Sequence, residues 1–316
     1  MDEKEKKLGK DFQKNMDYLN KTLAVNVNFD IVYRVIHIGG RNAVMYLIDG
    51  FCKDEMMQKM LQYFITLKPE DMPQDAHGMS KKCMPTVEVD LEDDMEQIIQ
   101  NLLSGVLILL IDGYDKALMI DARTYPSRSV QEPEKDKVLR GSKDGFVETI
   151  VFNTALIRRR IRSENLRMEM MNAGKSSKTD IALCYMDNRA DKKFLQQIKD
   201  RINALEVDAL TLNQESLAEC LYTSKWYNPF PKFKYTERPD TAAAQILEGN
   251  IIILVDNSPS AMILPNSIFD MVEEADDYYF PPITGSYLRI TRIIIAFLTY
   301  IAAVFSAFML TPSRQS

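Results

Sequence analysis

The sequence contains little of what metal and nucleophilic chemistry requires. Its 316 residues include two histidines, His37 and His77, and four cysteines that form no C-x-x-C pair. Structural zinc needs closely spaced cysteine and histidine ligands, and a catalytic triad needs a histidine beside its nucleophile. The dispersed cysteines are typical of residues that stay reduced in a protein interior. The sequence therefore predicts no metal, no cofactor and no enzymatic activity.

The chain also lacks an apolar segment at its N-terminus. It begins MDEKEKKLGKDFQKN, which is charged throughout and has no apolar core of a signal peptide. We therefore expect the N-terminal domain to stay in the cytoplasm. The net charge of −6 and the pI near 5.2 give no general attraction to nucleic acid, so we expect no partner of that kind.

One long apolar run lies near the C-terminus. Ile293 to Leu310 contains eighteen residues without a charge, and as a helix it is ~27 Å long, close to the hydrocarbon thickness of a bilayer. Arg289 and Arg292 precede it, which favours a cytoplasmic location for that side. A buried core helix is the alternative, but the run has no polar stripe. We predict a transmembrane helix at 287–312, and we expect the chain, which stops at Ser316, to be truncated after it.

Strands and helices alternate before this run, which indicates an α/β fold, and part of the pattern occurs twice. SGVLILLIDGYDKALMID (Ser104–Asp121) matches EGNIIILVDNSPSAMIL (Glu248–Leu264) without a gap, with Gly105 over Gly249. Each segment has a glycine, an apolar strand, an Asp-led turn and a second strand, so each predicts a β-hairpin. A helical pattern precedes each hairpin, MEQIIQNLL in one case and TAAAQILE in the other.

A second matched pair lies upstream. Met45–Gln62 resembles Leu183–Asp200, and in both a strand ends at an acidic turn before a helix. The order strand, helix, strand, helix, hairpin thus occurs twice, which favours two similar, duplicated mixed α/β subdomains over chance likeness. The predicted divisions are a charged tail or helix at 1–21, a first subdomain at 22–122, a linker at 123–145, a second subdomain at 146–284 and the membrane helix.

The linker leads into a segment that reads as one long helix. Arg123–Gly145 is rich in proline, glycine, serine and charge. Apolar residues in Phe146–Met171 roughly follow helical spacing, and the same segment carries five arginines. A run of arginines on a helix is usually a solvated face. The functional alternative is contact with a partner subunit or with anionic lipid headgroups.

Charged residues at the predicted strand ends are the candidate contacts for a ligand or partner. In TERPD, Glu237 and Arg238 could form an ion pair where sheet meets helix, with a structural role as the alternative. Asp256 belongs first of all to a hairpin turn. Residues of the linker could face a cleft between the two halves. The candidate set is Arg128, Arg140, Asp144, Glu237, Arg238 and Asp256.

Several of these stretches resemble the spore germination GerA family. The N-terminal block FQKNMDYLNKTLAVNVNFDI is more similar to the stage V sporulation AF branch than to the nutrient-receptor A subunits. The other blocks are SRSVQEPEKDKVLRGSKDGFVE (Ser127–Glu148), KTDIALCYMD (Lys178–Asp187), YTERPD (Tyr235–Asp240), LEGNIIILVDNSP (Leu247–Pro259) and ADDYYF (Ala275–Phe280).

The resemblance implies a two-part domain on the inner side of the spore inner membrane, followed by several spanning helices. It implies a germinant receptor or ion-channel subunit that contacts membrane lipid, forms a homo-oligomer and works with other germination membrane proteins. A single span cannot enclose a pore within one chain. The alternative is a membrane-anchored scaffold or interaction module that binds other germination proteins without forming a pore.

Overall fold

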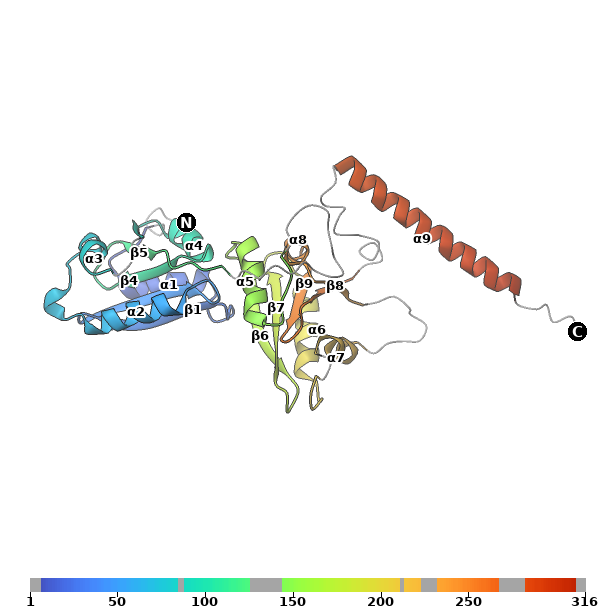
Figure 1. Ribbon diagram of the computed structural model, residues 1–316, viewed down its shortest axis with the longest axis horizontal. Helices are drawn as coiled ribbons and strands as arrows, with labels where there is room; N and C mark the ends of the chain where they lie inside the picture. The colour runs from blue at the N-terminus through green and yellow to red at the C-terminus, as the bar shows by residue number, and fades with distance from the viewer. Residues whose placement is uncertain are drawn as a thin grey trace, which may run out of the picture.

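The computed structural model of the 316-residue chain describes residues 7–84, 88–125, 144–210, 213–222, 232–266 and 282–310. These residues form two lobes, each built on a β-sheet, and a long C-terminal helix that extends away from them (Figure 1). The fold is mixed α/β, and both sheets are five-stranded and antiparallel among the described residues.

The first lobe begins with helix α1 (Phe12–Thr22), whose N-cap Asp11 accepts a hydrogen bond from the backbone of Lys14. Its strands and helices follow in the order β1 (Ile31–Ile38), β2 (Arg41–Ile48), α2 (Asp54–Thr66), η2 (Pro69–Asp71), α3 (Ala76–Lys82), β3 (Val89–Glu92), α4 (Met95–Leu103), β4 (Leu107–Ile111) and β5 (Ala117–Ile120). The strand order across the sheet is β1-β2-β4-β5-β3.

The second lobe repeats this arrangement. Its elements are α5 (Ile150–Arg160), β6 (Leu166–Ala173), β7 (Thr179–Met186), α6 (Lys192–Asn203), α7 (Gln214–Leu221), β8 (Lys234–Thr236), α8 (Pro239–Glu248), β9 (Ile251–Val255) and β10 (Ala261–Leu264). The strand order is β6-β7-β9-β10-β8, which is the order of the first sheet in the same sequence positions.

The two predicted hairpins occupy equivalent places. β4 pairs with β5 and β9 pairs with β10, both antiparallel, and each hairpin follows a helix that was also predicted. Gly105 and Gly249 have φ angles of 98° and 106° just after α4 and α8, in the left-handed region that ends a helix at little cost for glycine. The repeated pattern therefore corresponds to a repeated architecture, whereas the exact subdomain boundaries stay a prediction.

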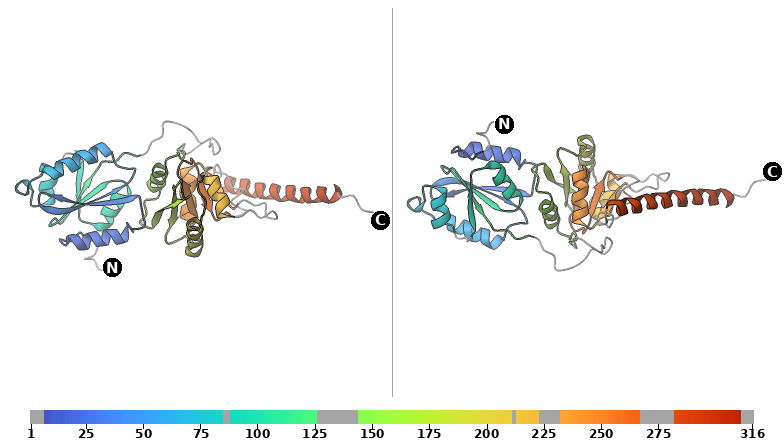
Figure 2. Two further views of the ribbon diagram at one scale, coloured as in Figure 1. Left: turned by 90° about the horizontal axis from the view of Figure 1, so that it is seen from below. Right: turned by 90° about the horizontal axis from the view of Figure 1, so that it is seen from above.

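Each sheet is covered by helices on both faces (Figure 2). In the first lobe, Leu19 of α1 and Ile98 of α4 pack on one face, and Phe64 of α2 and Met79 of α3 pack on the other. In the second lobe, α5 and α8 cover one face and α6 and α7 the other. The central strands β4 and β9 are buried along their whole length, which explains their unbroken apolar sequences.

The predicted helix over Phe146–Met171 is confirmed over Ile150–Arg160 and wrong on either side of it. Ile161 ends α5 with extended backbone angles, and the chain then forms β6, which pairs with β7 over eight residues. Leu, Met, Arg and Glu are good helix formers, so local preference favoured a helix there. Burial of Leu166 and Met168 in the apolar cluster that the sheet shares with α5 and α8 outweighs that preference.

The C-terminal segment is helical, as predicted. Helix α9 (Pro282–Leu310) includes the whole uncharged run. Within the described residues, no helix combines the length and the apolar character that a membrane crossing requires. The helix is confirmed, and its crossing of a membrane stays a prediction.

Candidate functional site

The two lobes meet through hydrogen bonds to the main chain of β6, at the edge of the second sheet. The Phe29 N–H donates to the Met168 carbonyl at 3.1 Å, and the Met168 N–H donates to Asn28 Oδ1 at 2.7 Å. The Asn28 amide in turn donates to the Leu23 carbonyl, so its orientation is fixed within the first lobe. A segment of the first lobe thus bonds to the outer edge of β6.

A buried ion pair lies beside this contact. Arg158 of α5 donates from Nε to Asp30 Oδ2 at 2.7 Å and from Nη2 to Asp30 Oδ1 at 3.0 Å. The two side chains are 0% and 2% exposed. The solvated-face interpretation of the arginine run is therefore wrong for Arg158. Its contact lies within the chain, in the other lobe.

Close packing at Gly50 completes the contact. Gly50 follows β2 with a φ of +81°, and a Cβ atom there would lie 3.2 Å from the Cβ of Ala155 on α5. Its backbone angles suit glycine, and its missing side chain leaves room for α5. The loop after β2 and the helix α5 therefore approach more closely than a larger residue would allow.

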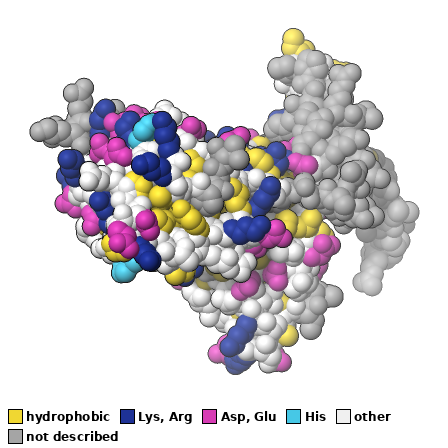
Figure 3. Space-filling view, turned by 60° about the vertical axis from the view of Figure 1, so that its left-hand side comes forward, with side chains coloured by type: hydrophobic (Ala, Val, Ile, Leu, Met, Phe, Trp, Pro, Cys, Tyr) yellow, Lys and Arg dark blue, Asp and Glu magenta, His cyan; other side chains and the backbone are white. Residues whose placement is uncertain are grey.

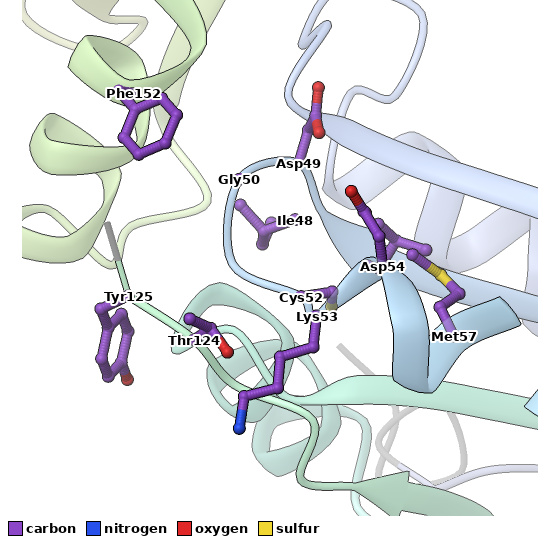
Figure 4. A pocket seen from close by; sticks show the side chains of 11 residues that line it. Ile48, Asp49, Gly50, Cys52, Lys53, Asp54, Met57, Thr124, Tyr125 and Phe152 are labelled. Atoms are coloured by element: carbon purple, nitrogen blue, oxygen red, sulfur yellow. The ribbon is translucent and has the colours of Figure 1, made fainter. Parts of the chain in front are cut away.

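A pocket of about 390 Å³ opens beside this loop, between the first lobe and α5 (Figure 4). It is lined by the end of β2, the start of α2, the segment after β5 and Phe152 of α5. Tyr125 on its wall packs edge-on against Phe51 at 5.3 Å between ring centroids, and the Arg159 guanidinium lies 4.4 Å from its ring. Carboxylates, a lysine and two aromatic rings surround the opening. The lining side chains that carry this chemistry are Asp49, Cys52, Lys53, Asp54, Thr124, Tyr125 and Phe152.

Burial is the main influence on the titratable groups of the pocket. Burial raises the pKa of the Asp49 carboxyl, and the carboxylates of Asp30 and Asp54 raise it further, although a hydrogen bond from the Gly50 backbone opposes them. Burial and the same acidic surroundings raise the pKa of the Cys52 thiol to about 11. Cys52 is thus a thiol at neutral pH and a poor nucleophile.

The candidate residues from the sequence lie elsewhere, around the segment that leads into α5. Asp144 pairs with Arg160 at 3.1 Å. The Glu237 carbonyl accepts a hydrogen bond from the Phe146 N–H at 2.8 Å. The first contact ties the segment before α5 to the last residue of that helix, and the second ties it to the loop between β8 and α8.

Asp256 and Arg238 have partners within the second lobe. Asp256 Oδ1 accepts from the Ile150 N–H at 3.2 Å, which caps the first turn of α5. Arg238 is 1% exposed and donates to Asp240 at the start of α8. Arg128 and Arg140 lie outside the described residues. A role of this set in binding a ligand or partner stays a prediction.

Sequence reasoning did not identify the contacts that join the lobes. Asn28 and Asp30 lie in the block FQKNMDYLNKTLAVNVNFDI, but neither they nor Gly50 match a binding or catalytic motif, and their partners lie more than a hundred positions away. One signal near Gly50 was the match of Met45–Gln62 with Leu183–Asp200, which predicted an acidic turn at the end of the strand that became β2. Within the described residues, no group of three or more His, Cys, Asp or Glu side chains is arranged to hold a metal ion.

Comparison with known proteins adds to this geometry. The family model described as Bacillus/Clostridium GerA spore germination protein matches residues 17–311, which run from within α1 through both lobes and all of α9. The chain belongs to the GerA family.

The relatives differ in their degree of similarity. Stage V sporulation protein AF of Bacillus subtilis (strain 168) is 35% identical over 281 residues, which are 88% of this chain and 57% of that protein. Spore germination protein KA of the same organism is 30% identical over 285 residues, or 88% of this chain and 52% of that protein. The higher identity with the AF protein agrees with the predicted branch.

A solved structure has the same overall fold. The N-terminal domain of the A subunit of the Bacillus megaterium spore germinant receptor GerK3 superposes with a TM-score of 0.58 at 25% sequence identity. The match covers 83% of this chain and 97% of that one. This GerA-family chain spans somewhat more than half the length of the two curated relatives.

Proposed function

We propose that this GerA-family chain acts in spore germination as the cytoplasmic N-terminal domain and first membrane helix of a receptor or ion-channel subunit in the spore inner membrane. The observation that carries the proposal is the extent of the family match, from residue 17 to residue 311, through both lobes and into α9. The partners we propose are membrane lipid, further copies of the chain and other germination membrane proteins.

The surface of α9 supports contact with lipid. Where its side chains are described, Ile294, Phe297 and Leu298 are 51%, 65% and 58% exposed. Each Å² of apolar surface left in water costs roughly 25 cal/mol, so an uncovered apolar helix is unfavourable in solution. The uncharged run Ile293–Leu310 has about the length of the hydrocarbon layer, and Arg289 and Arg292 precede it. Insertion of this run into a membrane removes the cost.

The joined lobes support a role in transmitting a signal. Because the buried Asp30–Arg158 pair and the Gly50 contact tie the first lobe to α5, the two lobes can move as one body. We propose that a partner or ligand acts on the charged residues around α5 and changes the contacts that they make. These residues include Asp144, Glu237, Arg238 and Asp256. A conformational change needs such contacts to differ between two states.

Membrane insertion is tested by expressing the full chain and extracting membranes with alkaline carbonate. The full chain should stay in the pellet, and a chain that ends at residue 286 should move to the supernatant. Recovery of the full chain in the soluble fraction would contradict membrane insertion.

The germination role is tested in spores. Removal of the gene should slow the loss of refractility after nutrient addition, and a complementing copy should restore it. Conductance of the full-length gene product in planar bilayers then distinguishes a channel subunit from a scaffold that forms no pore. Unchanged germination of the deletion strain would contradict the proposal.

A further inference from the structure

The first sheet has an open edge. Strand β1 lies at the end of the sheet, and among the described residues it pairs with β2 alone. The outer side of such a strand presents unpaired N–H and C=O groups, which another extended segment can bind. In recognition by strand addition, the main-chain bonds give affinity and alternate side chains give specificity. The side chains along β1 therefore indicate what the edge can bind.

The register shows which backbone groups point outward. The Asp49 N–H donates to the Asp30 carbonyl at 2.8 Å, just before β1 pairs with β2. Residues of an antiparallel ladder alternate between those that bond to the partner strand and those that do not. The N–H and C=O groups that point toward the open edge are those of Tyr33, Val35 and His37.

A groove of about 310 Å³ follows this edge, between β1 and α2. Arg34 and Ile36 line it from the strand, and Leu61, Phe64 and Ile65 line it from the helix. None of the residues that line the groove is acidic. Hydrophobic side chains gather among charged ones on the surface of the molecule (Figure 3). The groove thus combines an apolar wall with the positive charge of a guanidinium group.

The second lobe shows how the equivalent place is neutralised. Glu169 of β6 pairs with Leu183 of β7, as Arg34 pairs with Met45 of β2. Met45 and Leu183 begin the two matched segments, so Glu169 is the counterpart of Arg34. Lys199 of α6 donates to the Glu169 carboxylate at 2.6 Å. A charge at this place of the sheet is thus balanced by an opposite charge within the second lobe.

The first lobe has no such balance in its described part. Leu61 of α2 holds the place of Lys199, and Arg34 forms no ion pair with the described residues. The edges differ as well, because the N–H and C=O groups of Met168 on β6 both bond to the first lobe. Among the described residues, the groove beside β1 therefore lacks both a covering segment and a carboxylate.

We propose that the edge of β1 binds an extended segment of a partner protein, in which an acidic side chain and an apolar one lie two positions apart. The segment adds as an antiparallel strand, like every described strand pair of this sheet. Its carboxylate faces Arg34. Its apolar side chain faces Ile36 and covers the wall formed by Leu61 and Ile65, of which Ile65 is 78% exposed.

Charge and pattern select this occupant. Opposite charges that face each other across two strands are favourable, and like charges there are unfavourable. A carboxylate supplies to Arg34 the opposite charge that Lys199 supplies to Glu169, whereas a basic segment would be repelled. Side chains two positions apart lie on the same face of a strand, so the acidic and the apolar group reach the groove together.

Peptide binding to the full chain in detergent tests the proposal. The probe is the fluorescein-labelled peptide Ser-Ile-Thr-Glu-Thr-Ile-Ser, compared with the same peptide carrying lysine in place of glutamate. Fluorescence anisotropy should show that the glutamate peptide binds about tenfold more tightly. Arg34→Glu should reverse this preference, with thermal unfolding as the check on folding. The control Lys59→Glu makes the same charge change at an exposed position of α2 outside the groove lining and should leave the preference unchanged.

Three results would overturn the proposal: no binding of the glutamate peptide, equal binding of both peptides, or an unchanged preference in a folded Arg34→Glu variant. Loss of the preference in Lys59→Glu would overturn it too, because the preference would then reflect the charge of the whole surface.

N-methylated peptides test the main-chain bonds. In the antiparallel register with glutamate opposite Arg34, the two threonine N–H groups bond to Tyr33 and Val35, and the glutamate N–H points away. N-methylation of both threonines should therefore weaken binding at least tenfold, and N-methylation of the glutamate should change it little. Equal effects of the two modifications would reject strand addition. The proposed role in germination rests on the family match and is unaffected by either result.

Discussion

Asp30 and Arg158 form a doubly hydrogen-bonded ion pair across the junction of the two lobes, although 128 positions separate them in the chain. Both side chains are buried, so water cannot solvate either charge when its partner is removed. Such a pair adds little net stability over an apolar pair, but the loss of one partner leaves an uncompensated charge. The pair therefore specifies how the lobes join.

Replacement of one partner should thus be costly. Asp30→Ala should lower the free energy of unfolding by about 3–5 kcal/mol, measured by urea titration with circular dichroism. The double variant Asp30→Leu, Arg158→Met should recover most of that loss. As a matched control, Asp144→Ala removes the partner of Arg160 in a pair whose carboxylate is 54% exposed, and it should cost about 0–1 kcal/mol. Equal losses in the single and the double variant would contradict this reasoning.

Asp49 should make stability depend on pH in the opposite direction from a salt-bridged carboxylate. Its pKa in the folded protein is raised, so the fold favours the protonated form, and stability falls as pH rises from the ordinary aspartate pKa through the folded value. Asp49→Asn should therefore stabilise the protein at neutral pH and have little effect below the ordinary value. Thermal unfolding of both proteins across acid and neutral pH measures the difference. A stabilisation that is the same at every pH would show that the charge is not its cause.

The cysteines should differ in reactivity. The Cys52 thiol, with its pKa near 11, should react slowly with iodoacetamide at pH 8, while the exposed Cys220 reacts readily. Asp54→Asn should speed the alkylation of Cys52, because one of the carboxylates that raise its pKa is removed. Mass spectrometry of labelled peptides gives both rates. Cys220 provides the internal control, since its rate should not change in the variant.

The turn of the second hairpin should contribute to the stability of α5. Asp256→Ala removes the acceptor for the Ile150 N–H and should cost about 0.5–2 kcal/mol in urea unfolding. Asp112→Ala is the matched change in the first hairpin, where the carbonyl of Asp112, instead of its carboxylate, accepts a bond from Arg41 at 3.3 Å. It should cost less. A larger loss for Asp112→Ala would show that the cap at Ile150 is not what Asp256 provides.

Much of the fold could be predicted because it is encoded locally and then repeated. The hairpins of Ser104–Asp121 and Glu248–Leu264, and the helices before them, follow from apolar runs, turn residues and a glycine after each helix. Strand β6 could not be predicted, since its residues favour a helix and only its pairing with β7 makes it a strand.

The candidate site was less accessible to sequence reasoning. Charge at strand ends pointed to Glu237, Arg238 and Asp256. The structure places Asp256 in a cap of α5 and Arg238 in an ion pair at the start of α8, and the Glu237 carbonyl accepts a hydrogen bond from the Phe146 N–H. The pocket of about 390 Å³ forms only where the loop after β2 lies beside the segment after β5 and Phe152 of α5. Those segments are far apart in the chain, and no spacing rule relates them.

The sequence by itself determined the family, the repeated order of elements and the uncharged C-terminal helix, because each depends on residues that are neighbours in the chain. The tertiary structure decided which side chains meet across the lobes: Asp30 with Arg158, Asn28 with the edge of β6, and Gly50 with Ala155. It also decided that β6 is covered while β1 stays open among the described residues. The physical reason is that burial and pairing depend on distances in space, which local patterns do not contain.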